Sequence, residues 1–218
     1  MDLHKHEQFE MEVLDKLNTT RLLDPLVFGG GTMLRLCWGL PRYSIDFDFW
    51  FIKKITYDDF FKKAKRLISS WYELTDSAVK YHSILLELSS EQYPSKLKIE
   101  IRKGISVCDF EQRIAFSPYA EKQVLVRVHT LKQSMENKIL AALDRKNIRD
   151  FFDIEFLLRQ GVPLKIDDAA AEKLRKIASS FKDRDFKVVL GSLLDKKMRN
   201  YYIKNRFSYL LAKLQSKY

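Results

Sequence analysis

The spacing of hydrophobic residues along this 218-residue chain changes once, near Thr130. Before that point, apolar residues with the period of a helix alternate with short runs that have the period of a strand; after it, the helical period continues to the end. We therefore predict an α/β (α+β) core with a mixed sheet over residues 1–129. A helical lobe over residues 130–218 is expected to pack on that core.

Periodicity and chain breakers predict the individual elements. In the first region, helices are expected over residues 6–17, from the glycines to about 38, and 57–71, and strands over 26–28, around Asp46, 83–88, 97–102 and 124–128. In the second region, helices are expected over residues 131–143, 148–158, 168–181, 182–194 and 196–214. Thr56 and Asp59 have the spacing of a capping box before the third helix.

Two aspartates lie close together in the strand that starts at Asp46. Side chains alternate along an extended segment, so Asp46 and Asp48 share one face while Phe47 and Phe49 point into the core. Carboxylates at that spacing repel each other unless a cation neutralises them, and ligation by oxygen alone suits Mg²⁺. The pair taken alone is more often part of a solvated surface or a helix cap.

Three glycines precede that strand. Gly29, Gly30 and Gly31 lie between the apolar run 26–28 and a helical pattern that starts at Met33. This order places bare backbone N–H groups at the start of a helix, where an anion such as a phosphate can bind. A glycine triplet alone is more often a tight turn.

The order of these motifs is more specific than either of them. The chain reads Phe28-Gly-Gly-Gly-Thr-Met-Leu-Arg35 and then Gly39-Leu-Pro-Arg-Tyr-Ser-Ile-Asp-Phe-Asp-Phe49. It closely resembles the AbiEii/AbiGii-type nucleotidyltransferase toxin family, a branch of the DNA polymerase β-like nucleotidyltransferases. The matching positions are Gly30, Gly31, Thr32, Leu34, Arg35, the run Leu40-Pro41-Arg42, Ser44, Asp46 and Asp48.

The resemblance implies a metal-dependent transfer of a nucleotide. Asp46 and Asp48 would hold two Mg²⁺ (or Mn²⁺) ions roughly 4 Å apart. Such enzymes need a third carboxylate from a neighbouring strand, and the resemblance assigns this role to Glu100, which also accepts the proton of the attacking hydroxyl. In the strand 97–102, Leu97, Ile99 and Ile101 alternate with Glu100, so the carboxylate is presented from the sheet. The wider superfamily usually has Asp there.

The triphosphate side of the site is expected to come from the glycine turn. Gly30, Gly31 and Thr32 would hold the β- and γ-phosphates of the nucleoside triphosphate through backbone N–H groups and a hydroxyl. Arg35 is also expected to contact the nucleotide, because it matches the family pattern. Ser44, two residues before Asp46, can face the same site.

A second charged cluster follows Thr130. Glu136-Asn-Lys138 is followed by Arg145 and then by Arg149-Asp150-Phe-Phe-Asp153, as in the family. The resemblance implies that Lys138 contacts the triphosphate and that Asp150 or Asp153 organises the site. Physical reasoning alone interprets these residues as a salt-bridged helix pair.

Charge is concentrated at the C-terminal end. Residues 165–218 hold fourteen Lys or Arg against six Asp or Glu, which is +8 of the formal net charge of +10. A polyanion such as RNA would be attracted there, although lysine-rich solubility explains the excess about as well. No apolar run approaches the ~20 residues that span a bilayer. Cys37 and Cys108 form neither a zinc spacing nor a disulfide framework, so we expect a cytoplasmic location.

The leading hypothesis is therefore a nucleotidyltransferase that transfers NMP from an NTP to an RNA acceptor. The resemblance implies the toxin of a toxin–antitoxin or abortive-infection system, with a cognate antitoxin and the tRNA 3′ end as acceptor. One alternative is nucleotidyl or phosphoryl transfer to a protein or small molecule. Another is a catalytically silent module that binds RNA or nucleotide.

Overall fold

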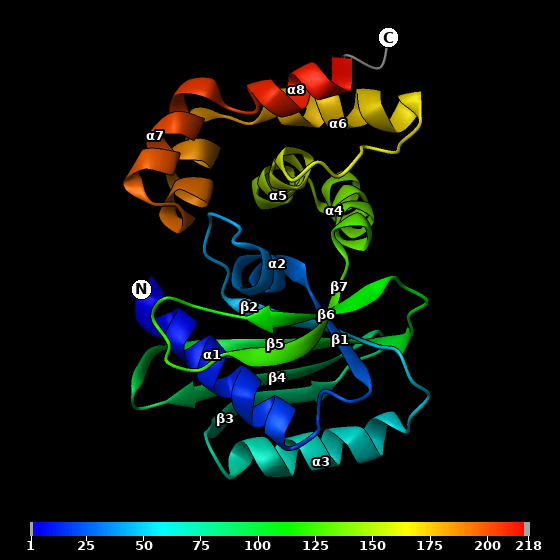
Figure 1. Cartoon of the computed structure of the whole chain (residues 1–218), viewed down its shortest axis with the longest axis vertical. Coiled ribbons are helices and arrows are strands. Elements are labelled where there is room, and N and C mark those ends of the chain that lie inside the picture. Colours follow the sequence, from blue (N-terminus) through cyan, green and yellow to red (C-terminus); the bar gives the residue numbers. More distant parts are fainter. Residues whose placement is uncertain (1, 216–218) are drawn as a thin grey trace. The chain divides into compact units, whose positions relative to one another are not determined.

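The structure is a computed structural model that describes residues 2–215. The chain divides into two compact units (Figure 1). One unit comprises Met1–Gly39 and Tyr43–His129, and the other comprises Leu40–Arg42 and Thr130–Tyr218. The three residues Leu40–Arg42 therefore belong with the second unit, although they lie within the sequence of the first.

The first unit is a mixed α/β domain, which confirms the predicted fold class. Its helices are α1 (Leu3–Thr19), α2 (Gly30–Trp38) and α3 (Tyr57–Ser69). Its strands are β1 (Leu26–Gly29), β2 (Asp46–Phe51), β3 (Glu73–Val79), β4 (Ser83–Ser90), β5 (Tyr93–Ile105), β6 (Phe110–Ala115) and β7 (Val124–His129). They form one sheet in the order β3-β4-β5-β2-β1-β7-β6, in which β2 is parallel to β5 and antiparallel to β1.

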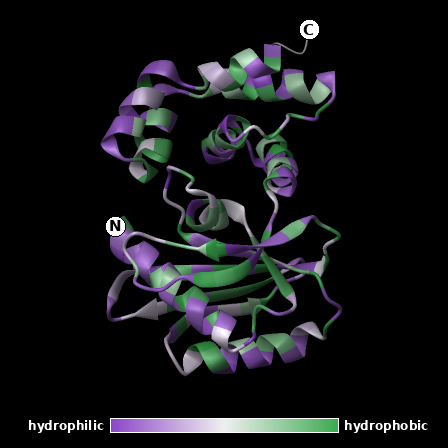
Figure 2. Cartoon of the chain, viewed as in Figure 1, coloured by the Kyte–Doolittle hydropathy of each residue, from purple (hydrophilic) through white to green (hydrophobic). Residues whose placement is uncertain are grey.

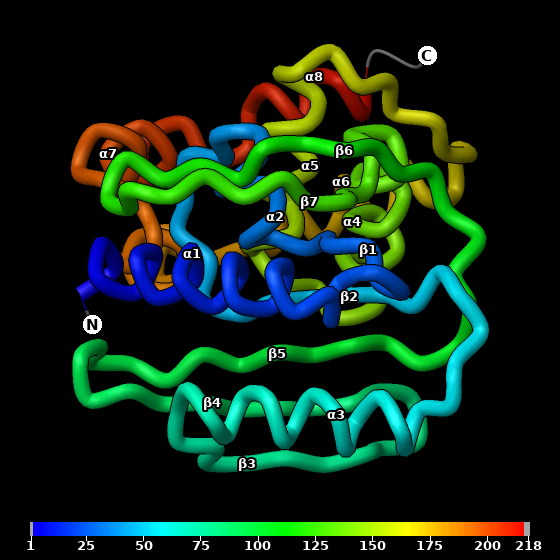
Figure 3. Tube along the Cα trace, turned by 60° about the horizontal axis from the view of Figure 1, so that its bottom comes forward, coloured from blue at the N-terminus to red at the C-terminus, as the bar shows by residue number. Residues whose placement is uncertain are grey.

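The two faces of the sheet differ in polarity. Along β2, Phe47, Phe49 and Phe51 are buried, whereas the residues between them are half-buried. The phenylalanine face is covered by α1 and α3, which run roughly along the strands in Figure 3, and α2 lies against the other face (Figure 1). Hydrophobic residues follow the central strands in Figure 2. Burying each phenylalanine contributes roughly 2–3 kcal/mol and fixes the register of β2, because a slip by one residue would expose all three.

The second unit is helical. It contains α4 (Leu131–Arg145), α5 (Ile148–Arg159), α6 (Asp168–Ser180), the π-helical turn η1 (Asp185–Leu190), the 3₁₀ turn η2 (Gly191–Leu193), α7 (Lys196–Asn205) and α8 (Ser208–Gln215). The side chains of Thr130, Asn147, Asp167 and Asp195 cap the starts of α4 to α7 by accepting backbone N–H groups. Within residues 2–215, every helix is too short or too polar to cross a bilayer.

Two edge elements of the sheet were not predicted. The strands β3 and β6 lie at the two ends of the strand order and pair on one side only. Their sequences, Glu-Leu-Thr-Asp-Ser-Ala-Val and Phe-Glu-Gln-Arg-Ile-Ala, lack the apolar content that identified the inner strands. Charged and polar residues are typical of edge strands, because one side of such a strand faces solvent.

Three local predictions were wrong. The segment 182–194 is not an α-helix but the turns η1 and η2. The predicted helix 196–214 is broken at Arg206, whose φ of 50° ends α7 and whose side chain donates to the carbonyl of Phe181 at 3.1 Å. The capping box does not form either: Thr56 is the N-cap of α3, but its side chain makes no capping hydrogen bond.

Candidate active site

Three carboxylates share one face of the sheet in the first unit. Asp46 and Asp48 are the half-buried positions of β2, and Asp48 is in register with Glu100 on the parallel strand β5. Residues in register on parallel strands point to the same face. Asp46, Asp48 and Glu100 therefore lie on the face opposite the phenylalanine core; the alternation along the strand predicted this face for the two aspartates.

The glycine turn lies directly against one of these carboxylates. Gly29 pairs with Asp48 across β1 and β2, and Gly30, with a φ of 75°, starts α2. A Cβ at residue 30 would overlap a carboxylate oxygen of Asp48. The first turn of α2 presents backbone N–H groups and the positive end of the helix dipole, so it favours an anion next to Asp48.

The Thr32 side chain connects α2 to β2. Thr32 is fully buried, and its hydroxyl donates a hydrogen bond of 2.7 Å to the backbone carbonyl of Asp46. This proton is used within the protein, so the side chain fixes the start of the strand that carries the carboxylates. Ser44 is half-buried and lies two residues before β2.

Glu100 is paired with a lysine of its own strand. Lys98 Nζ lies 3.1 Å from Glu100 Oε2. Burial alone would raise the pKa of Glu100, but hydrogen bonds from Lys98 and Ser83 and the charge of Arg102 lower it below its ordinary value. Among residues 2–215, no three His, Cys, Asp or Glu side chains converge to hold a metal ion. The carboxylate oxygens have the donor chemistry that Mg²⁺ prefers, but one carboxylate is held by an ammonium group.

Arg35 is held on the side of α2 that faces α1. Its Nε donates to Glu7 Oε2 at 2.8 Å, and its guanidinium stacks on Tyr43 at 4.2 Å from the ring centre. Ser117 donates to the other oxygen of Glu7 at 2.7 Å. Arg35 also lines a groove of about 390 Å³ with Phe116, at the C-terminal half of α2. The predicted nucleotide contact of Arg35 therefore involves a side chain that already has an acidic partner.

The second charged cluster is a buried ion-pair network of the second unit. Arg42 binds Asp153 through two hydrogen bonds of 2.6 Å each, and Lys138 Nζ lies 2.6 Å from Asp153 Oδ2. Asp153 is completely buried. Burial alone would raise its pKa, but Arg42 and Lys138 hold the pKa below its ordinary value.

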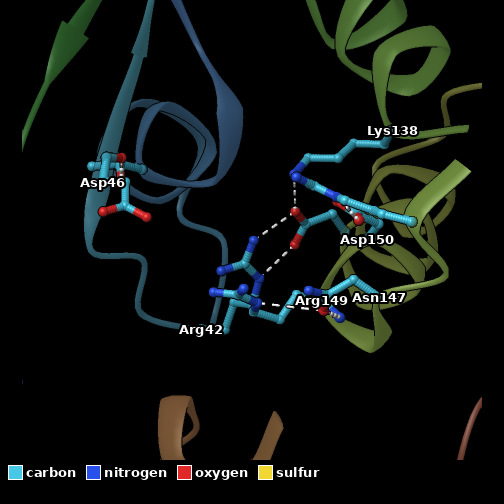
Figure 4. A network of polar contacts seen from close by, with 9 residues as sticks. Arg42, Asp46, Lys138, Asn147, Arg149 and Asp150 are labelled. Carbon is cyan, nitrogen blue, oxygen red and sulfur yellow. Dashed lines mark hydrogen bonds and ion pairs between the residues drawn. The ribbon is translucent and has the colours of Figure 1, made fainter. Parts of the chain in front are cut away.

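Asp150 extends this network along α5. It accepts two hydrogen bonds of 2.7 Å from Arg145, and Lys138 Nζ lies 3.3 Å away (Figure 4). The Lys138 side chain is only 10% exposed, whereas Arg145 is 54% exposed. Three positively charged side chains, Arg42, Lys138 and Arg145, thus form ion pairs with two aspartates. These five side chains together carry a formal charge of +1. The prediction that Lys138 contacts a triphosphate stays a prediction.

Sequence reasoning missed two partners of the predicted site residues. The sequence pattern did not single out Lys98, although it lies two residues from Glu100 and so on the same face. Arg42 was noted only as part of the Leu-Pro-Arg match. Its partner Asp153 is 111 positions away, and no spacing rule relates residues at that separation.

Comparisons with known proteins concern the family and the fold of the chain. A model of the family described as "Nucleotidyl transferase AbiEii toxin, Type IV TA system" matches residues 12–210. Two solved structures from Helicobacter pylori, JHP933 and a proposed nucleotidyltransferase, share 21% identity each, with TM-scores of 0.58 and 0.57. The first alignment covers 96% of this chain and 94% of the other, and the second covers 97% of each. At this identity the likeness shows the fold. No curated protein matches the chain.

Proposed function

This chain belongs to the AbiEii nucleotidyl transferase toxin family, and on that basis we propose that it transfers NMP from an NTP to an RNA acceptor with the help of Mg²⁺ or Mn²⁺. The family establishes a nucleotidyltransferase of a toxin–antitoxin system, with a nucleotide substrate and a cognate antitoxin. One observation carries the proposal for the chemistry: Asp48 lies against Gly30 at the start of α2 and in register with Glu100.

The chemistry of the donor set supports the proposed metal requirement. Asp46 and Asp48 would hold the divalent ions, with Glu100 as the third carboxylate, because all three lie on one face and offer only oxygen ligands. A bound divalent ion neutralises negative charge on the triphosphate and activates the attacking hydroxyl. Thr32 acts as a positioning residue, because it fixes the carbonyl of Asp46.

The triphosphate is proposed to bind at the first turn of α2. Gly30 and Gly31 offer backbone N–H groups there, and Gly30 has no side chain that would displace Asp48. Ser44, just before β2, and Arg35, in the last turn of α2, are also proposed to contact the nucleotide. The bond between the α-phosphorus and the bridging oxygen breaks, the acceptor hydroxyl oxygen bonds to that phosphorus, and pyrophosphate leaves. Glu100 is the proposed acceptor of the hydroxyl proton.

An RNA acceptor, such as the 3′ end of tRNA, is supported by charge. The segment 165–218 carries a formal charge of +8. Counterion release from RNA phosphates makes such an attraction strong and steeply dependent on salt. A protein or small-molecule acceptor would not need this excess of positive charge.

The test is an incubation of the purified protein with each labelled NTP, total tRNA and Mg²⁺. We expect label in the tRNA, none without the divalent ion, and none with Asp46→Asn. The matched control is Asp59→Asn, which removes an exposed carboxylate from the first turn of α3 in the same unit and should keep full activity. Label that appears in protein instead of tRNA would contradict the RNA acceptor. Full activity of Asp46→Asn would contradict the metal assignment.

A further inference from the structure

Lys98 lies among the three carboxylates of the acidic face. It is in register with Asp46 on the neighbouring strand, and its ammonium group lies 3.1 Å from Glu100. The Lys98 side chain is 39% exposed, so its ammonium group remains accessible to solvent. Lys98 is therefore a cation that the protein itself supplies to this face, in direct contact with Glu100.

Asp46 and Asp48 act on the charge of Lys98 together with Glu100. Burial would lower its pKa, but the hydrogen bond to Glu100 and the charges of Glu100, Asp46 and Asp48 raise it above the ordinary value. All three carboxylates thus interact with the same ammonium group. An opposite charge near these acids reduces the repulsion that would otherwise separate them.

The same contact opposes a shared metal site. One oxygen of Glu100 already accepts from the Lys98 ammonium group, and no three potential ligands converge among residues 2–215. A divalent ion that binds Glu100 through this oxygen therefore competes with the ammonium group for it. The released Lys98 would remain two residues away on the same strand, on the same face.

We propose that Lys98 is an internal counter-ion that holds Glu100 in the metal-free protein and competes with the divalent cation for this carboxylate. This inference rests on the proposed function, since it needs a divalent ion at Asp46 and Asp48. Lys98 thereby sets the concentration of metal at which Glu100 joins the two aspartates. It acts as a positioning residue through Glu100.

The experiment measures binding of Mn²⁺ alone, without nucleotide, by electron paramagnetic resonance. Lys98→Met removes the competing charge and should bind Mn²⁺ about tenfold more tightly, since a neighbouring charge at this distance shifts such equilibria by about that factor. Lys98→Arg keeps the charge and should stay near the wild type. The matched control is Lys96→Met, which removes a lysine from the same strand that pairs with Glu87 at 2.8 Å instead.

The outcomes separate the two proposals. If Asp46→Asn weakens Mn²⁺ binding but Lys98→Met leaves it unchanged or weaker, the counter-ion role is wrong and the metal site stands. If Asp46→Asn binds Mn²⁺ as the wild type does, or the wild type binds none, the metal site itself is wrong and the inference falls with it. A gain in affinity for Lys96→Met equal to that for Lys98→Met would also overturn it, because general charge would then explain both.

Discussion

The Asp48 carboxylate fills space that exists only because Gly30 has no side chain. The Asp48 carboxylate lies where the Cβ of any other residue at position 30 would be, and the φ of 75° at Gly30 is one that side chains rarely allow. The glycine turn therefore has two functions in one place. It starts α2, and it leaves room for a carboxylate at the N-terminus of that helix.

Gly30→Ala should displace Asp48 and lower the transfer activity by a factor of about 100 or more, since small displacements of reacting groups have effects of this size. The substitution also adds backbone strain of about 1–3 kcal/mol. The measurements are the steady-state rate with labelled NTP and the free energy of unfolding in urea.

The control for Gly30→Ala is Gly39→Ala. Gly39 ends α2 with a φ of 71°, but a Cβ there would meet no atom within 4 Å. Gly39→Ala should lower the free energy of unfolding through backbone strain and leave the transfer activity unchanged. Equal losses of activity in both variants would mean that strain, and not the space for Asp48, explains Gly30.

Thr32→Val should weaken the connection between α2 and β2. It keeps the shape of the side chain but leaves the half-buried carbonyl of Asp46 without the 2.7 Å hydrogen bond from Thr32, at a cost of about 1–3 kcal/mol. Thr32→Ser keeps the hydroxyl and should retain most of the activity. If Thr32→Ser is as inactive as Thr32→Val, the contribution of Thr32 is its methyl group and not the hydrogen bond.

The parts of the site that sequence predicts are those encoded by short-range periodicity. The alternation of Asp46, Phe47 and Asp48 fixes which side chains share a face, because a strand with one buried face has a single register. The same rule placed Glu100 on a sheet face. It did not show that Glu100 is in register with Asp48, because the pairing of β2 with β5 depends on the whole sheet.

The missed features depend on contacts between distant residues. The ion pair of Arg42 with Asp153 joins residues 111 positions apart, and the edge strand β6 is stabilised by pairing with β7 and not by its own composition. The end of α7 at Arg206 has the same origin, since the side chain binds the carbonyl of Phe181. Local propensity contains none of this information.

Arg42→Met should destabilise the second unit more than Lys138→Met. Without Arg42, the buried Asp153 loses two hydrogen bonds of 2.6 Å each and keeps its contact with Lys138, and breaking such a buried pair costs about 3–5 kcal/mol. Without Lys138, Asp153 keeps Arg42 and Asp150 keeps Arg145, so we expect about 1–2 kcal/mol. Urea unfolding measures both.

Lys138→Met also distinguishes a structural role of Lys138 in the ion-pair network from a role in nucleotide binding. Because the variant should fold, its kinetics are interpretable: a higher KM for NTP with little change in stability supports the predicted triphosphate contact. A large loss of stability with an unchanged KM would assign Lys138 to the ion-pair network alone.

The stability of the first unit should decrease as the pH falls from about 6.5 to 4, and His129 should cause part of this decrease. Burial lowers the pKa of His129 to about 4, from an ordinary value of 6.5. The unfolded chain therefore binds a proton in this range that the folded protein does not bind. The resulting stabilisation is fully present above pH 6.5, and up to about 3 kcal/mol of it is lost as the pH falls through the folded pKa.

His129→Gln removes the titrating group but not its neighbours, so the difference in unfolding free energy between wild type and variant should change by this amount between pH 7 and 4. Urea titrations at several pH values measure it, and a difference that stays constant over this range would show that His129 binds its proton equally in both states.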